Sequence, residues 1–402
     1  MGMNTQSNPY DTDFEALLRC LPDDREAAAV RLGALTRKRE IRNADTLLHL
    51  ALAYAWLDLS LRSVVAWAQQ QGIARLADVS LLERLQKAVP FLSWLLMRLL
   101  ETKTEAPVIA GLPYRVRVMD ATVICEPGSK GTDWRVHMAM DLSTQSIGAL
   151  EVTDNKGGES LTRFQVQPDD LVVGDRAYAT RPSICHVVAA GGHVLVRFAW
   201  QNLPLQNRDG TPFDLLGHLK ELTEEGQTGE WNVRTAPTAE LPSIAGRVIA
   251  IRKTQKACEE ARRRTLQTAK RKGHTPDART FFTCDYLLLF TTVAASVMEA
   301  TTLLRLYRYR WQIECGFKRM KSLLCLDGLR AKNEALCQAY LYSKLIGALL
   351  TDRSCGSWAA FPPWSGPEYP SGFAMASPAN DLVDAATGRV RRAHPGRLGT
   401  GT

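Results

Sequence analysis

The segment YRVRVMDATVI, Tyr114–Ile124, is where the hydrophobic pattern of the chain changes from a helical to a strand period. Apolar and polar residues alternate in it, so Val116, Val118 and Asp120 share one face of a predicted strand. Before this segment the pattern is helical, and after it short strands and helices follow one another. The segment therefore marks the start of a mixed α/β sheet.

The segments after this strand continue the mixed pattern. An apolar strand that ends at Asp175 is followed by a helix with closing glycines, as in a strand–helix unit. The predicted order is strand 133–144, strand 145–154, a helix that starts in 157–164, strand 169–175, helix 181–192 and strand 193–200.

The composition divides the chain into four regions. We predict an all-helical N-terminal domain at 1–106, and an α/β core made of 107–200 and 286–352. Residues 201–285 are more polar and read as an insertion subdomain with strands, and 353–402 read as an irregular or disordered tail rich in Pro, Gly, Ala and Ser. Within the first region, 70–80 joins two helical patterns, with Gly72 and a possible cap at Ser80. A helix-turn-helix unit and an ordinary helical hairpin explain this segment equally well.

Overall composition limits the function classes. The chain has 402 residues and a net charge of +8, which suggests a polyanionic partner, either nucleic acid or an anionic membrane surface. We expect no secretory signal and no membrane span, because no apolar run approaches about 20 residues. The nine cysteines contain no C-x-x-C pair and read as free thiols in a reducing cytoplasm.

Two aspartates stand at the ends of apolar patterns. Asp120 continues the apolar face of its strand, where an ionised carboxylate needs an arginine or a metal ion as counter-charge. Asp175 lies just past a buried strand, where open α/β sheets place their ligands. The structural alternatives are a strand-end aspartate in solvent for Asp120 and a turn that caps the next helix for Asp175.

A third acid lies within a basic helix, LYRYRWQIECGFKRMKSLL, residues 306–324. At about 100° per residue, Tyr307, Arg310, Glu314 and Lys321 fall within a stripe of roughly 60° on a continuous helix. A solvated basic face would explain the cations alone, but not the acid among them. A carboxylate there would repel phosphate unless it carries a metal, and hard oxygen ligands suit Mg²⁺ or Mn²⁺. Two such ions about 3.5–4 Å apart can activate an attacking oxygen and stabilise a leaving one.

These motifs resemble the DDE transposases of bacterial insertion sequences, the insertion-sequence-four family. The family signature is Tyr, two residues, Arg, three residues, Glu, six residues, Lys, and it matches Tyr307, Arg310, Glu314 and Lys321 without a gap. MDATVI (119–124) and GDRAYA (174–179) are similar to the family's two aspartate motifs. The similarity runs from about residue 40 to residue 352.

The resemblance implies a ribonuclease-H-like core with a β-rich insertion, behind an N-terminal domain that helps bind transposon ends. It implies that Asp120, Asp175 and Glu314 are catalytic metal ligands for Mg²⁺, with Mn²⁺ as a substitute. The site residues that would bind DNA are Tyr307, Arg310, Lys318 and Lys321. It also implies a dimer that nicks double-stranded DNA at inverted-repeat ends and joins the freed 3′-hydroxyl to target DNA, without a small-molecule substrate.

Two alternatives keep the same fold. One is a catalytically decayed protein that still binds DNA ends, and the other is a metal-dependent nuclease that does not join strands. The tail suggests the catalytically decayed protein, because its sequence differs from that of the family. Family members usually continue with apolar helical sequence after the helix near LYSKLIGALLTDR (341–353). We interpret the tail as the product of a shifted reading frame. His137 and Trp200 also lie near the motifs, but we favour packing roles for both over site roles.

Overall fold

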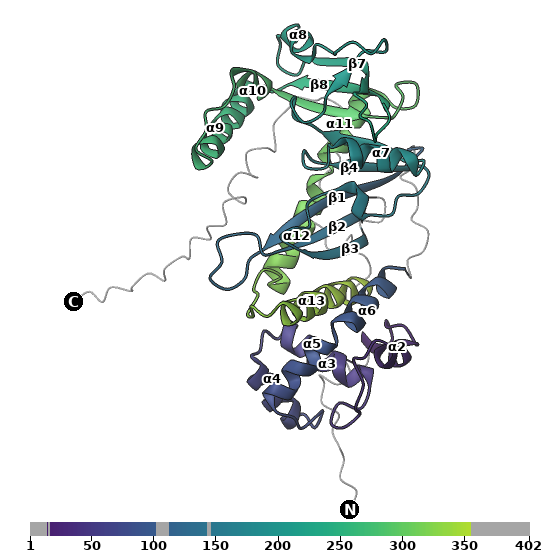
Figure 1. Cartoon of the computed structure of the whole chain (residues 1–402), viewed down its shortest axis with the longest axis vertical. Helices are drawn as coiled ribbons and strands as arrows, with labels where there is room; N and C mark the ends of the chain where they lie inside the picture. Colours follow the sequence, from purple (N-terminus) through teal and green to yellow (C-terminus); the bar gives the residue numbers. More distant parts are fainter. Residues whose placement is uncertain (1–13, 15–16, 102–111, 143–145, 355–402) are drawn as a thin grey trace, which may run out of the picture. The chain divides into compact units, whose positions relative to one another are not determined.

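The computed structural model describes residues 14, 17–101, 112–142 and 146–354 (Figure 1). The expectations for the tail, including the shifted reading frame, fall almost entirely outside the described residues. The described chain forms two compact units. One contains the residues up to Arg252 and those from Tyr286 onward, and the other contains Lys253–Asp285.

The N-terminal region is helical, as the sequence predicts. Its helices are α2 (Arg25–Arg31), α3 (Ala44–Trp56), α4 (Leu61–Gln70), α5 (Asp78–Lys87) and α6 (Val89–Glu101). Side-chain oxygens of Asn43 and Ser60 cap α3 and α4 by accepting hydrogen bonds from backbone N–H groups. The predicted cap at Ser80 is wrong, because α5 already begins at Asp78 with Ala77 in the N-cap position.

A nine-stranded mixed sheet follows, in the order β3-β2-β1-β4-β5-β9-β8-β7-β6. The strands β1, β4 and β5 are parallel neighbours, and the remaining neighbours are antiparallel. The bounds are β1 (Arg115–Ile124), β2 (Trp134–Asp141), β3 (Ser146–Asp154), β4 (Asp170–Gly174), β5 (His193–Arg197), β6 (Leu205–Gln206), β7 (Thr228–Thr235), β8 (Ala245–Arg252) and β9 (Tyr286–Thr291). The mixed sheet predicted from the sequence is thus confirmed.

Two short helices accompany these strands, α7 (Arg181–Ala189) and α8 (Leu215–Lys220). The helix expected to start in 157–164 is reduced to one 3-10 turn, η1 (Leu161–Arg163). Phe164 returns to extended backbone, with φ −114° and ψ 139°, and its buried side chain ends the turn against the core. That expectation was therefore wrong in extent.

The strands of the predicted insertion extend the sheet of the core. β9 pairs with β5 on one side and with β8 on the other, so β8, β7 and β6 continue the same hydrogen-bonded ladder. The described part of the second compact unit lies between β8 and β9 in the sequence. It contains α9 (Gln255–Arg271) and α10 (Ala278–Thr283). The exact domain boundaries drawn from the sequence stay predictions.

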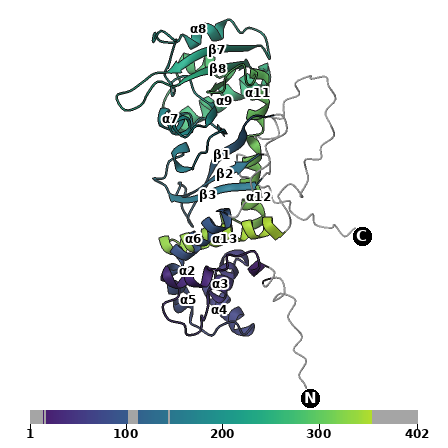
Figure 2. The ribbon, with the colours of Figure 1, turned by 90° about the vertical axis from the view of Figure 1, so that its right-hand side faces the viewer.

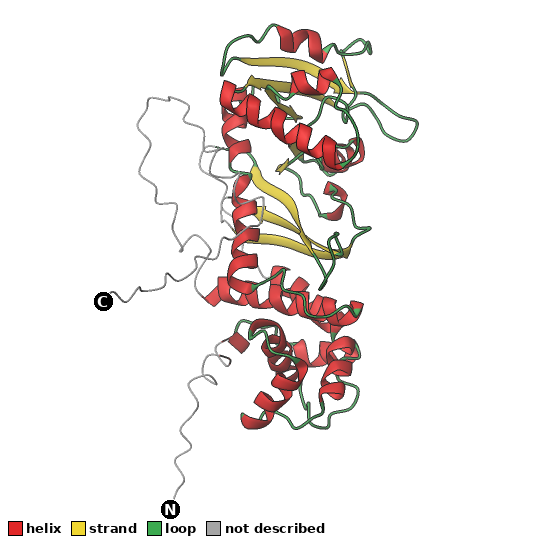
Figure 3. Cartoon of the chain, turned by 90° about the vertical axis from the view of Figure 1, so that its left-hand side faces the viewer, coloured by secondary structure: helices red, strands yellow, loops and turns green. Residues whose placement is uncertain are grey.

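Two long helices, one against the sheet and one against the N-terminal helices, complete the first unit. α12 (Trp311–Leu324) crosses β1 and β2, and α13 (Glu334–Ser354) packs against α3, α5 and α6 (Figures 2 and 3). The face of β1 that carries Val116 and Val118 is apolar up to Asp120. It belongs to the same hydrophobic core as Phe317 of α12. Gly347 allows α13 to approach α3, because a Cβ there would lie 1.9 Å from the Trp56 ring. The helical region and the sheet therefore share one hydrophobic core.

The opposite face of β1 contains a buried ion pair. Arg117 is only 6% exposed and donates to Asp170 at the start of β4 over 2.9 Å, and to the Gln165 carbonyl over 2.7 Å. Arg115 donates to Asp141 of β2 over 2.8 Å. These contacts tie β1 to both of its neighbours and hold their register just before Asp120.

Candidate active site

The pairing of β1 with β4 brings two of the predicted acids to one level, just past the point where the parallel ladder ends. β1 pairs with β4 so that Val118 lies opposite Val173. Asp120 and Asp175 each follow two residues later, so they occupy equivalent positions on neighbouring strands. This edge of an open α/β sheet is where such sheets bind ligands.

Strand β5 places a cation at the same level of the sheet as Asp120 and Asp175. It runs parallel to β4 with Val173 opposite Leu195, and its last residue, Arg197, is therefore level with Asp175. Our sequence analysis did not single out Arg197. A signal was present, because both strands end an apolar run with a charged residue.

The third predicted acid, Glu314, lies on a helix and not on a strand. Tyr307 belongs to α11 (Ala300–Arg308), Glu314 belongs to α12, and Arg310 is the N-cap residue of α12. The single continuous helix expected across these residues is therefore wrong. Tyr309 and Arg310 form a turn between two helices, but both keep right-handed helical dihedrals. For that reason the side chains of Tyr307, Arg310 and Glu314 still point to the same side.

Arg310 connects acids that are far apart in the sequence. Its Nη1 donates to Oδ2 of Asp120 over 3.4 Å, and its Nη2 makes a hydrogen-bonded ion pair with Glu314. The guanidinium carbon also lies 5.9 Å from the ring centroid of Tyr307. The counter-charge that the sequence requires for Asp120 is thus supplied by an arginine in this structure.

The charges of Asp175 and Glu314 both act on Asp120. The pKa of Asp120 is raised to about 7, mainly by burial and to a smaller extent by the negative charges of Asp175 and Glu314. The Ala121 N–H and Arg310 oppose this increase. Asp120 on β1, Asp175 just after β4 and Glu314 on α12 therefore share one electrostatic environment.

The two predicted lysines have different surroundings. Lys321 donates from Nζ to the Val123 carbonyl near the end of β1 over 3.0 Å. Lys318 is exposed on α12, and no contact between it and the three acids is present in the described structure. The structure thus brings Lys321 to the strand that carries Asp120 and leaves Lys318 facing solvent.

His137 lies on the other face of the sheet from Asp120. It is paired with Ala121, one residue beyond Asp120, and its Nε2 is 2.9 Å from Oγ1 of Thr153. Its side chain is fully buried. This placement agrees with a packing role. Trp200, just after β5, is half-buried.

His137 should make stability dependent on pH. Burial, followed by the positive charges of Arg163 and Arg135, lowers the pKa of His137 to about 4. The unfolded chain binds a proton near pH 6.5, so this contribution to stability is intact above pH 6.5 and is lost as the pH falls toward 4. Between pH 7 and 4.5 we expect a loss of about 2–3 kcal/mol from this residue.

Urea titrations of the wild type and His137→Gln across this pH range measure that loss. Glutamine can still hydrogen-bond Thr153, and it does not titrate. The difference in unfolding free energy between the two proteins should therefore change with pH by the stated amount. Parallel pH curves would contradict the prediction.

The carboxylate set suits a divalent cation that arrives with a substrate. Hard oxygen ligands are the kind that Mg²⁺ and Mn²⁺ prefer, and Arg310 already places positive charge between Asp120 and Glu314. One Asp175 oxygen accepts from the Ala177 N–H over 2.8 Å, and the other has no hydrogen bond within the described structure. Among the described residues, no group of three or more His, Cys, Asp or Glu side chains is arranged so that it could hold a metal ion. The fit to a divalent cation therefore rests on the chemistry of the three carboxylates and not on a formed metal site.

The chain is similar to known proteins over most of its length. The family described as the transposase DDE domain matches residues 111–350. The transposase for insertion sequence element IS421 of Escherichia coli is 36% identical over 351 residues, which cover 86% of this chain and 94% of that protein.

The chain belongs to the DDE transposases. The transposase for insertion sequence element IS231B of Bacillus thuringiensis is also similar, with 23% identity over 378 residues, 84% of this chain and 78% of that protein. The resemblance to the insertion-sequence-four family and the expected ribonuclease-H-like fold are confirmed.

As a DDE transposase, the protein is an enzyme that acts on DNA, and its domain implies a divalent metal requirement. Within the described residues, no helix combines the length and the apolar character that a membrane span needs.

Proposed function

We propose that Asp120, Asp175 and Glu314 are the catalytic carboxylates of this transposase and that Mg²⁺, or Mn²⁺ in its place, binds to them. The observation that supports this most strongly is the link from Arg310 to both Asp120 and Glu314, with Asp175 level on the next strand. Bound there, the metal would lower the pKa of an attacking water or hydroxyl and neutralise charge on the phosphodiester.

The other residues of this site position the DNA. Arg310 contacts two of the acids, Tyr307 lies beside Arg310, and Lys321 contacts the strand that carries Asp120, so these residues would hold the phosphates on either side of the reacting bond. When a phosphate replaces a carboxylate as the partner of Arg310, the freed carboxylate oxygens can turn toward the reacting group. Lys318 is exposed and would contact a more distant phosphate.

The DNA partners in this proposal are the inverted-repeat ends of an insertion sequence and a target duplex. The chain would nick an end, and the freed 3′-hydroxyl would attack the target phosphodiester, with no small-molecule substrate. We propose a homodimer on DNA, because two ends must be held together for joining. The place of action is the cytoplasm, on the nucleoid.

Incubation of the purified chain with labelled end DNA and a target plasmid, with and without Mg²⁺, tests this function. We expect nicks at the end and covalent end–target joints only with Mg²⁺. Sequence-specific binding without nicks would instead identify a decayed end-binding protein. Nicks without joints would identify a nuclease.

Arg197 is a further DNA-positioning residue in this proposal. Burial lowers the pKa of Arg197, and so do the positive charges of Arg176 and Arg310. No carboxylate of the described chain forms an ion pair with Arg197. Arg197, Arg176 and Arg310 are cations that act on one another, opposed by the charge of Asp175, and a DNA phosphate would supply a further anion.

Arg197→Ala should therefore slow end cleavage about 10- to 100-fold, which corresponds to one lost charged hydrogen bond of about 1.5–3 kcal/mol. Single-turnover cleavage at increasing protein concentration measures the maximal rate and the half-saturating concentration separately. Arg208→Ala, at an exposed loop position, is the control and should match the wild type. Equal rates for both variants would remove Arg197 from the site.

A further inference from the structure

The second compact unit carries most of the net charge of the chain. Its described part, Lys253–Asp285, contains nine basic and four acidic side chains, a net charge of +5, while the whole chain has +8. Neither the acidic site nor the family signature includes any of these residues. The location of this charge therefore requires a separate explanation.

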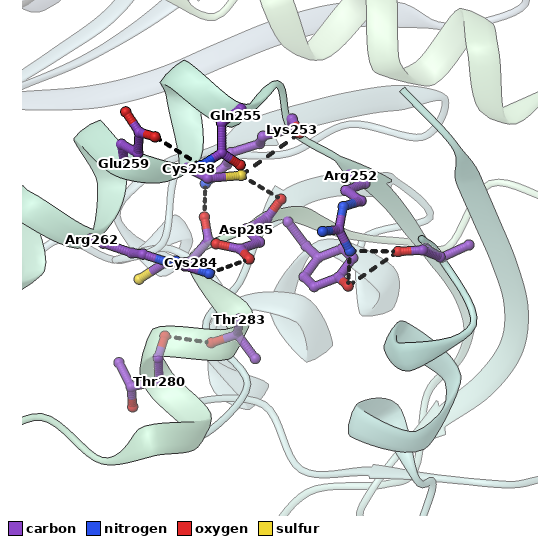
Figure 4. Close-up of polar contacts among 12 residues, drawn as sticks. Arg252, Lys253, Gln255, Cys258, Glu259, Arg262, Thr280, Thr283, Cys284 and Asp285 are labelled. Atoms are coloured by element: carbon purple, nitrogen blue, oxygen red, sulfur yellow. Dashed lines mark hydrogen bonds and ion pairs between the residues drawn. The ribbon is translucent and has the colours of Figure 1, made fainter. Parts of the chain in front are cut away.

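The base of this unit is closed by internal contacts. Arg262 donates to Oδ2 of Asp285 over 2.6 Å, and Nζ of Lys253 donates to the Cys284 carbonyl over 2.5 Å (Figure 4). The Cys258 thiol donates to the carbonyls of Lys253 and Asp285 over 3.7 and 3.8 Å. One acid and two cations are thus used to fold the unit, and the remaining cations are not needed there.

The remaining cations of α9 lie on its outer side. Cys258 and Ala269 form the buried side of the helix. At about 100° per residue, the outer cations occupy an arc of about 120° on the opposite side. They are Lys256, Arg263, Arg264, Lys270 and Arg271, and all are exposed.

Only part of this outer charge is neutralised within the unit. Glu260 forms ion pairs of 2.7 Å with both Arg263 and Arg264. Within the described part of this unit, Lys253–Asp285, four exposed cations have no ion-pair partner. They are Lys256, Lys270, Arg271 and Lys272. A helix rise of about 1.5 Å per residue places Lys256 about 21 Å from Lys270, the length of about six base pairs.

We propose that the outer side of α9 is an accessory DNA-binding surface that holds the phosphate backbone of a duplex without reading its sequence. The proposal rests on DNA being the partner of the transposase. A membrane surface fits less well, because an interfacial helix needs an apolar face. Leu266 is the only large apolar side chain that is strongly exposed on α9.

The salt dependence of DNA binding tests this surface. We expect a variant with Lys256→Gln, Lys270→Gln, Arg271→Gln and Lys272→Gln to bind duplex DNA more weakly, whether or not the duplex carries an end sequence. If three to four phosphate contacts are lost, the slope of log K against log salt falls by about 3. Glu259→Lys, on the same helix, should raise the slope by about 1, which a folding defect cannot do.

A second variant with the same charge change is the control. Lys130→Gln, Arg208→Gln, Lys220→Gln and Arg234→Gln remove four exposed cations outside α9. This variant should keep the wild-type slope within about 1. Equal slopes for the wild type and the α9 variant, or equal losses in both variants, would overturn the proposal. Stronger binding to phosphatidylserine vesicles than to the duplex at the same salt would also overturn it.

This experiment separates the present proposal from the proposed catalytic function. If the wild type nicks end DNA with Mg²⁺ and the α9 variant has an unchanged slope, only the α9 proposal fails. If the slope of the α9 variant falls as expected but the wild type forms no nick with Mg²⁺, the α9 proposal stands and the catalytic proposal fails.

Discussion

Glu314→Gln should reduce Mg²⁺-dependent nicking of end DNA at least about 1,000-fold, a change of about 4 kcal/mol in the barrier. Glutamine has the same size as glutamate and can still accept a hydrogen bond from Arg310. It cannot supply the negative charge that a divalent cation requires from this position. The reduction therefore reports the loss of one proposed metal ligand from an otherwise intact helix.

Two measurements complete this experiment. Gel-shift titration with end DNA should give a dissociation constant within about threefold of the wild type, because the cations of α12 are retained. Calorimetric titration with Mn²⁺ should show weaker binding. Glu299→Gln, at the exposed N-cap position of α11, is the matched control and should nick at the wild-type rate. A Glu314→Gln protein that retains more than a tenth of the activity would refute the assignment of this carboxylate.

Arg247→Met should destabilise the first unit by about 3–5 kcal/mol, because it leaves several buried partners without a donor. Arg247 lies on β8 with only 2% of its surface exposed. Its guanidinium donates to the Val293 carbonyl over 2.8 Å and to Glu230 over 2.5 Å, and it also bonds to the Met298 carbonyl. These carbonyls belong to the connection from β9 to α11, the helix that contains Tyr307.

Urea denaturation followed by circular dichroism measures this loss as a lower transition midpoint. Arg234→Met is the matched control on the adjacent strand β7, since Arg234 is exposed and donates only to the Ser243 hydroxyl over 3.0 Å. We expect a change of less than about 0.5 kcal/mol for the control. A loss below about 1 kcal/mol for Arg247→Met would mean that other donors replace the guanidinium.

Much of the fold was predictable because it follows from local patterns. The period of two at Tyr114–Ile124, and the short apolar strand before Asp175, predicted the mixed sheet. The helical period before residue 101 predicted the N-terminal helices. The errors were local as well, such as the cap at Ser80, where a helix began earlier than its side chains suggested.

Spatial relations between distant residues were harder to predict. The hydrophobic pattern of β9 does not indicate which strands it pairs with, so the continuation of the core sheet into β8, β7 and β6 appeared only in three dimensions. For the same reason Arg197 was overlooked, because its position level with Asp175 depends on the pairing of β4 and β5.

The sequence by itself determined the class of fold and the family, because apolar periods and the signature from Tyr307 to Lys321 are local properties of the chain. It also gave the three acids as a prediction. Only the tertiary structure decided that Arg310 joins Asp120 to Glu314, although 190 positions separate Arg310 from Asp120. Strand register and helix packing set such contacts, and both depend on the burial of apolar surface over the whole unit.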